Sequence, residues 1–226
     1  MGGGLPLTGR VVALDAGHNA LNGRYPLRDN ALVPAGGFRK ACNTTGTSTQ
    51  AGYPEHAYAW SVVTRAADLL RAQGARVVLT RPDDASFGPC VNERAAISNG
   101  ARADLMISVH ADGGPTDGYG FHVIEPALAP DGGNAGILDS SARLGVVLRS
   151  AFAAATGEPY STYTGSQGFT RRSDLAGLNL SRVPAVFIEC GNMRNADDAR
   201  KLTATVFQQH AAQAIADAAV AFLARH

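Results

Sequence analysis

Four residues that lie far apart in the sequence are of the types that bind and assist a catalytic metal ion: His18, Glu55, His110 and Glu189. Two imidazoles and a carboxylate are a known ligand set for catalytic Zn²⁺, which keeps its remaining position for water or substrate. A further carboxylate beside the metal is what a hydrolase needs as a general base. The residue types therefore predict a metal-dependent hydrolytic site.

Each of these residues follows or opens a predicted element. His18, His110 and Glu189 end apolar runs with the character of strands, and Glu55 opens a helix after Pro54. A histidine at a strand end is as often a hydrogen-bonded turn residue, and a glutamate in a first helical turn often only complements the helix dipole. Glu189 is more telling, because a carboxylate at the end of a buried strand costs several kcal/mol without a partner.

The residues before His18 are expected to orient it. Gly17 can adopt backbone conformations that other residues avoid, so we expect it to turn the His18 ring into a cleft. Asp15 is close enough in sequence to hold a ring nitrogen of His18, as the partners of metal-bound histidines usually do. The sequence therefore predicts that Asp15 orients the His18 ring and does not itself bind the metal.

The elements that must position these residues alternate between strands and helices. Such alternation is typical of an α/β fold, and we predict a single domain over residues 10–226 with a mostly parallel twisted sheet of about six strands and helices on both faces. Residues 1–9 are expected to form a flexible segment. Ligands of such sheets bind beyond the carboxyl ends of the strands. The clear strands are 10–14, 76–80, 104–109, 120–124 and 184–189, and the helices are 55–73, 91–99, 140–156 and 196–225, the last with a break near Ala204.

A long segment from Asn19 to Pro54 joins two of the candidate ligands. It is rich in Gly, Asn, Thr and Pro, and Gly36-Gly37 is a turn signal that could close a hairpin. Loops of this length inside a compact domain usually serve function or are mobile. We therefore expect this segment to cover or shape the groove above the site.

The composition excludes several classes of protein. The chain has 226 residues, 17% of them charged, and a formal net charge of +1, so it lacks the electrostatic footprint of a nucleic-acid-binding protein. No apolar run approaches the roughly 20 residues that cross a bilayer. The first residues, Met1 to Pro6, lack the charged and apolar regions of a signal peptide, so we expect none in this chain. We take the protein to be a monomer.

Three cysteines leave the redox compartment open. Cys42 and Cys90 lie in polar loops, and Cys190 ends an apolar strand. Three free thiols would suit a cytosolic enzyme, whereas a pair between the two loop cysteines would indicate an oxidising compartment. Connectivity cannot be deduced from sequence, so both readings stand at this point.

The motifs together resemble one family. These are Asp15-Ala-Gly-His18, the helix-opening Glu55, Ser108-Val-His110-Ala-Asp112, and Pro184-Ala-Val-Phe-Ile-Glu189-Cys-Gly-Asn-Met-Arg-Asn195. From about Val11 to the C-terminal helix, the chain resembles the zinc-dependent N-acetylmuramoyl-L-alanine amidases of the type-3, AmiC-like family.

This resemblance implies a function and a ligand set. It implies one Zn²⁺ held by His18, Glu55 and His110, with Glu189 as the catalytic carboxylate. It implies hydrolysis, in peptidoglycan or muropeptides, of the amide between the lactyl group of N-acetylmuramic acid and the L-alanine of the stem peptide, an activity typical of an autolysin. It further implies an exported, extracytoplasmic protein, which favours a Cys42–Cys90 disulfide over free thiols.

Some positions depart from the family pattern. Ala16 replaces the usual proline, and Cys190-Gly191-Asn192 replaces the usual residues after the catalytic glutamate. Neither change removes a ligand. Arg171, Arg172 and Asn192 are candidates for substrate contacts. Alternatives are another zinc hydrolase of cell-wall peptides, either a peptidase or a deacetylase, a non-catalytic peptidoglycan-binding module, and a plain structural α/β domain.

Overall fold

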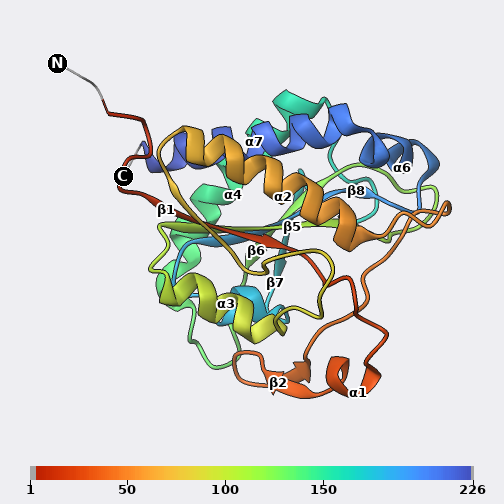
Figure 1. Ribbon diagram of the computed structural model, residues 1–226, viewed down its shortest axis with the longest axis horizontal. Coiled ribbons are helices and arrows are strands. Elements are labelled where there is room, and N and C mark those ends of the chain that lie inside the picture. The colour runs from red at the N-terminus through yellow and green to blue at the C-terminus, as the bar shows by residue number, and fades with distance from the viewer. Residues whose placement is uncertain (1–3, 225–226) are drawn as a thin grey trace.

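A six-stranded sheet forms the centre of the protein. The computed structural model describes residues 4–224, and its strands lie in the order β4-β1-β5-β8-β6-β7 (Figure 1). The pairs from β4 to β8 are parallel, whereas β6 is antiparallel to β8 and parallel to β7. The predicted mostly parallel sheet of about six strands is confirmed. Its strands are β1 Val11–Ala16, β4 Arg76–Leu79, β5 Leu105–Asp112, β6 His122–Pro126, β7 Phe169–Arg172 and β8 Ala185–Asn192.

Helices cover both faces of the sheet, as predicted. Figure 1 shows α2 and α7 above the sheet and α3 below it. The predicted break near Ala204 is also confirmed, because extended backbone at this residue separates α6 from α7. No helix among residues 4–224 is both long and apolar enough to span a bilayer. The long helices are α2 Glu55–Ala72, α4 Leu138–Thr156 and α7 Thr205–Leu223, and the shorter ones are α3 Val91–Gly100, α5 Ala176–Asn179 and α6 Ala196–Thr203.

The alternation of side chains along the strands makes the two faces of the sheet different. In β5, Ile107 and Val109 belong to the large apolar core under α2, α4 and α7. Ser108 and His110 alternate with them and therefore point to the face that α3 covers. That face has a smaller apolar cluster, which includes Met106 and Ile124. The sheet thus has one mostly apolar face, which contributes stability, and one face with room for polar groups.

The long segment before α2 is partly ordered into secondary structure. The strands β2 (Leu32–Pro34) and β3 (Arg39–Ala41) form an antiparallel hairpin, which confirms the turn predicted at Gly36-Gly37. Both glycines have φ angles in the left-handed region, at 82° and 93°. A short helix, α1 (Pro26–Asp29), precedes the hairpin and was not predicted. In Figure 1 the hairpin and α1 lie below the sheet, on the same side as α3.

A disulfide joins this segment to the body of the protein. Cys42, just after β3, is bonded to Cys90, which caps the N-terminus of α3. Cys190 is a buried free thiol. The structure therefore supports the pairing of the two loop cysteines. Of the predicted flexible segment 1–9, residues 1–3 lie outside the described part of the chain, while Leu7 is buried and its amide donates to Gln73.

We predict that the double variant Cys42→Ser/Cys90→Ser is less stable by about 2–4 kcal/mol, because the crosslink restricts the unfolded chain between two cysteines that are 48 positions apart. Urea unfolding of the two proteins measures the difference. A reductant provides the control: it should destabilise the wild type by the same amount and leave the double variant unchanged. Equal stability of oxidised wild type and double variant would contradict the prediction.

Candidate metal centre

The side chains of His18, Glu55 and His110 converge on one point at the end of the sheet. Oε1 of Glu55 lies 3.1 Å from Nε2 of His18 and 2.9 Å from Nδ1 of His110. One ligand atom from each residue lies within 4.8 Å of the others, and no other such group of His, Cys, Asp or Glu occurs among the described residues. Two imidazoles and a carboxylate at this spacing fit a Zn²⁺ ion.

Tight backbone packing places His18. A Cβ atom on Gly17 would come within 2.3 Å of the His110 ring, so only glycine allows the two segments to approach this closely. It is His18 itself, not Gly17 as expected, that has a left-handed φ, at 58°. Histidine tolerates this conformation better than most residues do. Nδ1 of His18 lies 2.9 Å from the backbone oxygen of Thr44, which orients the ring.

Glu55 and His110 are held by their own neighbours. Glu55 is the first residue of α2, where the helix N-terminus favours a negative charge, and its Oε2 accepts from the amide of Thr47 at 2.9 Å. The His110 ring stacks on Phe187 of β8, with ring centroids 5.2 Å apart and planes only 6° from parallel. All three candidate ligands therefore have fixed orientations before any metal binds.

The charges of the cluster reinforce one another. Burial by itself would raise the pKa of Glu55, but His18 and His110 outweigh it and hold the pKa well below the usual range. Burial lowers the pKa of His18, and Glu55 more than offsets this, so the net shift is upward. A cation that binds the cluster therefore competes with protonation of His18.

Glu189 lies next to this cluster in the sheet. It is the register partner of His110 in the parallel pair β5–β8, so both side chains are on the face that α3 covers. Its Oε2 atom is buried and has no hydrogen-bond partner among the described residues. Burial, followed by the nearby charges of Glu55 and Asp112, raises the pKa of Glu189 well above its usual range. A carboxyl group of this kind can accept and return a proton near neutral pH.

Strands β5 and β8 continue past the two site residues. The sequence suggested that the strands end at His110 and Glu189, but they run on to Asp112 and Asn192. The register shifts between His110 and Asp112, which marks a β-bulge or similar irregularity. Bulges are frequent next to active sites, where they redirect side chains.

Asp15 supports the site in a different way from the one predicted. It does not contact the His18 ring, which is bonded to Thr44. Instead, the buried Asp15 carboxylate accepts hydrogen bonds from Thr80, Ser108 and Arg94. Burial opposes its ionisation, but Arg94 and the two hydroxyl groups outweigh it and lower the pKa of Asp15 to about 2.

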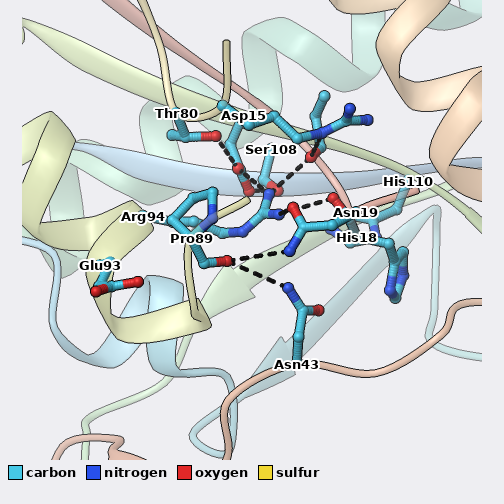
Figure 2. A network of polar contacts seen from close by, with 12 residues as sticks. Asp15, His18, Asn19, Asn43, Thr80, Pro89, Glu93, Arg94, Ser108 and His110 are labelled. Atoms are coloured by element: carbon cyan, nitrogen blue, oxygen red, sulfur yellow. Dashed lines mark hydrogen bonds and ion pairs between the residues drawn. The ribbon is translucent and has the colours of Figure 1, made fainter. Parts of the chain in front are cut away.

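Arg94 connects Asp15 to the candidate metal ligand His18. Figure 2 shows its guanidinium among polar groups of the β1 end. Nη1 donates to Asp15 and to the backbone oxygen of Ala16, both at 2.6 Å. Nη2 donates to the backbone oxygen of His18 at 2.7 Å and to Asn19 at 2.6 Å. These bonds hold the unusual backbone turn that presents the His18 ring.

A cleft of about 390 Å³ opens beside the cluster. The apolar part of its lining includes Met106, Ile124 and Phe187. Three cationic side chains, Lys40, Arg94 and Arg172, also line it. Nε and Nη2 of Arg172 form ion-pair hydrogen bonds to Asp174 at 2.9 and 2.6 Å. One ligand in this cleft could therefore contact the three-residue cluster, the Glu189 carboxyl group, an apolar surface and a positive charge.

The other two candidates for substrate contacts lie elsewhere. Arg171 is not among the residues that line the cleft; its Nε donates to Glu125 at 3.0 Å, and its side chain is 70% exposed. Asn192 is buried, and its side-chain amide donates to the backbone oxygens of Pro115 and Gly118, both at 2.7 Å. Asn192 thus holds the loop after β5 in place.

Three residues that shape the site were missed by the sequence analysis. Thr44 acts through its backbone oxygen, which no sequence pattern reveals. Arg94 occupies an ordinary position in α3, and only its burial in the fold marks it as special. Phe187 could have been found from the sequence, because it lies two residues before Glu189 in a strand and therefore shares its face.

Comparisons with known proteins show the family of the chain. Residues 12–221 match the Amidase_3 family, described as N-acetylmuramoyl-L-alanine amidase. The chain is 40% identical over 219 residues to the N-acetylmuramoyl-L-alanine amidase Rv3717 of Mycobacterium tuberculosis, covering 96% of this chain and 88% of the relative. It is similar to the crystal structure of the amidase Ami1 from Mycobacterium smegmatis, with a TM-score of 0.90, 39% identity and coverage of 99% and 100%. The apo Ami1 from Mycobacterium abscessus gives a TM-score of 0.90, 41% identity and coverage of 96% and 100%.

We predict that Arg94→Met lowers the stability of the metal-free protein by about 3–5 kcal/mol, because it leaves the buried Asp15 carboxylate without its counter-charge. Arg71→Met is the matched control, since Arg71 forms only an exposed ion pair with Asp68 and should change stability by less than about 0.5 kcal/mol. Urea unfolding with a chelator present measures both. Similar losses for the two variants would contradict the role of Arg94.

The ion pair of Asp15 and Arg94 also predicts a pH dependence of the free energy of unfolding. The pKa of Asp15 is about 2 in the folded protein against an ordinary value of 3.8, so its carboxylate stabilises the fold above pH 3.8. This contribution is lost as the pH falls toward about 2. Arg94→Met lacks the charge that lowers this pKa, so the difference in unfolding free energy between wild type and Arg94→Met should shrink as the pH falls from 3.8 toward about 2 in the same measurement.

Proposed function

The chain belongs to the N-acetylmuramoyl-L-alanine amidase family, and we propose that it is a zinc-dependent member in which His18, Glu55 and His110 hold the metal. In this proposal it hydrolyses the amide between the lactyl group of N-acetylmuramic acid and the L-alanine of the stem peptide. The observation that carries the proposal is the convergence of the three donors beside a buried carboxyl group in one cleft.

The side chains around the cleft suit this reaction. A Zn²⁺ ion, when bound, supplies Lewis-acid activation of water and of the scissile carbonyl. Glu189 accepts a proton from the attacking water and returns it to the amide nitrogen, so that the product leaves as an amine. Its burial favours this cycle, because a raised pKa lets one carboxyl group act first as base and then as acid. The apolar wall at Phe187 limits the access of bulk water.

The disulfide supports an extracytoplasmic location. A bond such as Cys42–Cys90 forms and persists in oxidising compartments and is rare in the cytosol. Peptidoglycan also lies outside the cytoplasmic membrane. We therefore infer that the protein is exported and acts on the cell wall in the manner of an autolysin.

We predict that Glu189→Ala retains zinc but loses at least about 100-fold in kcat, because the proton transfer contributes this much or more. His18→Ala should lose both zinc and activity. Mass spectrometry of a soluble muropeptide, incubated with each zinc-loaded protein, identifies the bond cut, and elemental analysis gives the zinc content. Release of N-acetylmuramic acid and an intact stem peptide is the expected result. A fully active Glu189→Ala would refute the assignment, and products of another bond would refute the amidase reaction.

Arg172 is the residue that we propose to bind a carboxylate of the stem peptide. It lines the cleft, and its pair with Asp174 uses Nε and Nη2, which leaves Nη1 to face a ligand. Its charge also acts on Glu189, so the two groups are close enough for one substrate to reach both. The free carboxylates of a stem peptide are the groups that this donor would recognise.

We predict that Arg172→Met raises KM about tenfold for a muropeptide with free stem carboxylates, because a charge-assisted hydrogen bond is lost. The same variant should change KM by no more than about twofold when the stem carboxylates are converted to amides. Arg171→Met is the matched control and should leave both substrates unaffected. Equal effects of Arg172→Met on the two substrates would rule out carboxylate recognition.

A further inference from the structure

Glu189 has a histidine beside it on each side in the sheet. In the parallel pair β5–β8 its register partner is His110, and in the antiparallel pair β6–β8 its partner is His122. Register partners project their side chains to the same face, with Cβ atoms of an antiparallel pair about 4.5–5.5 Å apart. His110, Glu189 and His122 therefore form a row across three strands, and only the first two have a role so far.

His122 is buried, and one of its ring nitrogens has no hydrogen-bond partner among the described residues. Its side chain lies on the face that α3 covers, since its neighbour Val123 belongs to the large core on the opposite face. The residue is only 4% exposed, and its Nδ1 atom has no hydrogen-bond partner among residues 4–224. The ring meets that of Tyr163 edge to face, with centroids 6.5 Å apart. A wholly structural histidine at this position would be expected to have its ring nitrogens bonded.

The same charged groups act on His122 and on Glu189. Desolvation lowers the pKa of His122 to about 4, with Asp112 of β5 opposing this and Arg172 of β7 adding to it. Asp112 and Arg172 also act on Glu189, together with Glu55. The hydroxyl of Tyr163 donates to Asp112 at 3.1 Å. The imidazole of His122 is therefore neutral near pH 7, with one N–H donor and one acceptor nitrogen.

Two unpartnered polar atoms thus lie on directly paired residues. Oε2 of Glu189 is an acceptor without a donor, and Nδ1 of His122 is a ring nitrogen without a partner. Buried polar atoms of this kind are uncommon, and two of them on one register pair call for a joint explanation. A hydrogen bond from the ring to the carboxylate would satisfy both.

We propose that His122 is a positioning residue for Glu189, whose Nδ1–H donates to Oε2 of the Glu189 carboxylate during the reaction and directs the other oxygen into the cleft. This inference rests on the proposed role of Glu189 in proton transfer. The donor holds an anion and not the substrate, so its loss slows turnover and leaves substrate binding nearly unchanged.

Three variants test this role. His122→Leu removes the donor, whereas His122→Asn keeps an N–H the same number of bonds from Cα as Nδ1. We expect His122→Leu to lower kcat about 10- to 100-fold, the loss of one charge-assisted hydrogen bond, with little change in KM or zinc content. His122→Asn should recover most of this loss. Thr170→Val is the matched control, because Thr170 of β7 carries another buried, unpartnered oxygen and should leave kcat unchanged.

A second measurement needs no turnover. The ¹⁵N NMR signals of the His122 ring report which nitrogen carries the proton and whether it is hydrogen-bonded. In the zinc-loaded wild type above pH 6 we expect protonated Nδ1, and we expect its signal to shift in Glu189→Ala. Wild-type kcat in His122→Leu, no recovery in His122→Asn, or an unchanged Nδ1 signal in Glu189→Ala would overturn the positioning role.

The outcomes separate the two proposals. An inactive Glu189→Ala beside a fully active His122→Leu would refute the role of His122 alone and leave the proposed function standing. A fully active Glu189→Ala would refute both. If His122→Leu fails to fold, two measurements still test the role of His122: the kcat of His122→Asn against wild type, and the NMR comparison. An unshifted Nδ1 signal in Glu189→Ala would contradict the hydrogen bond.

Discussion

The buried guanidinium of Arg94 is the interaction on which the rest of the site depends. Its hydrogen bonds reach the Asp15 carboxylate and the backbone of the β1 end, where His18 adopts a left-handed conformation. An unusual backbone conformation persists only when its surroundings overdetermine it. Arg94 supplies that constraint from α3, and Thr44 fixes the ring from the other side. The first candidate metal ligand in the chain, His18, is therefore held by residues from two other segments.

One face of the sheet contributes mainly to stability, and the other face carries the residues of the candidate site. The large apolar core lies under α2, α4 and α7, and it lets the opposite face carry polar groups whose burial costs free energy. Within that second face the register aligns His110, Glu189 and His122 across neighbouring strands. Because β6 is antiparallel to β8, the chain runs through this row in opposite directions on the two strands. The three polar side chains lie side by side because of the order of the strands as well as because of the residue types.

Much of the fold could be predicted from the sequence, because helical periods and apolar runs directly reflect burial. Three of the four candidate site residues were conspicuous as polar types at the ends of apolar runs, and Glu55 was conspicuous as the first residue of a helix after Pro54. Other features left no such signal. The strand β7, with the sequence Phe-Thr-Arg-Arg, lacks apolar alternation, so the opposite directions of Arg171 and Arg172 were hidden. The pair of Arg94 with Asp15 spans 79 residues, and no local pattern encodes a contact over that separation.

The disulfide has a consequence for the thermodynamics of association. It ties Cys42 to the start of α3, and the residues that follow Cys42 carry the Thr44 oxygen and the Thr47 amide that orient two candidate metal ligands, His18 and Glu55. This short stretch is thereby anchored at Cys42 on one side and by Glu55 of α2 on the other. The conformational entropy of this stretch is lost when the protein folds and not when a substrate binds. Binding of a substrate in the cleft therefore does not have to offset the cost of ordering this stretch.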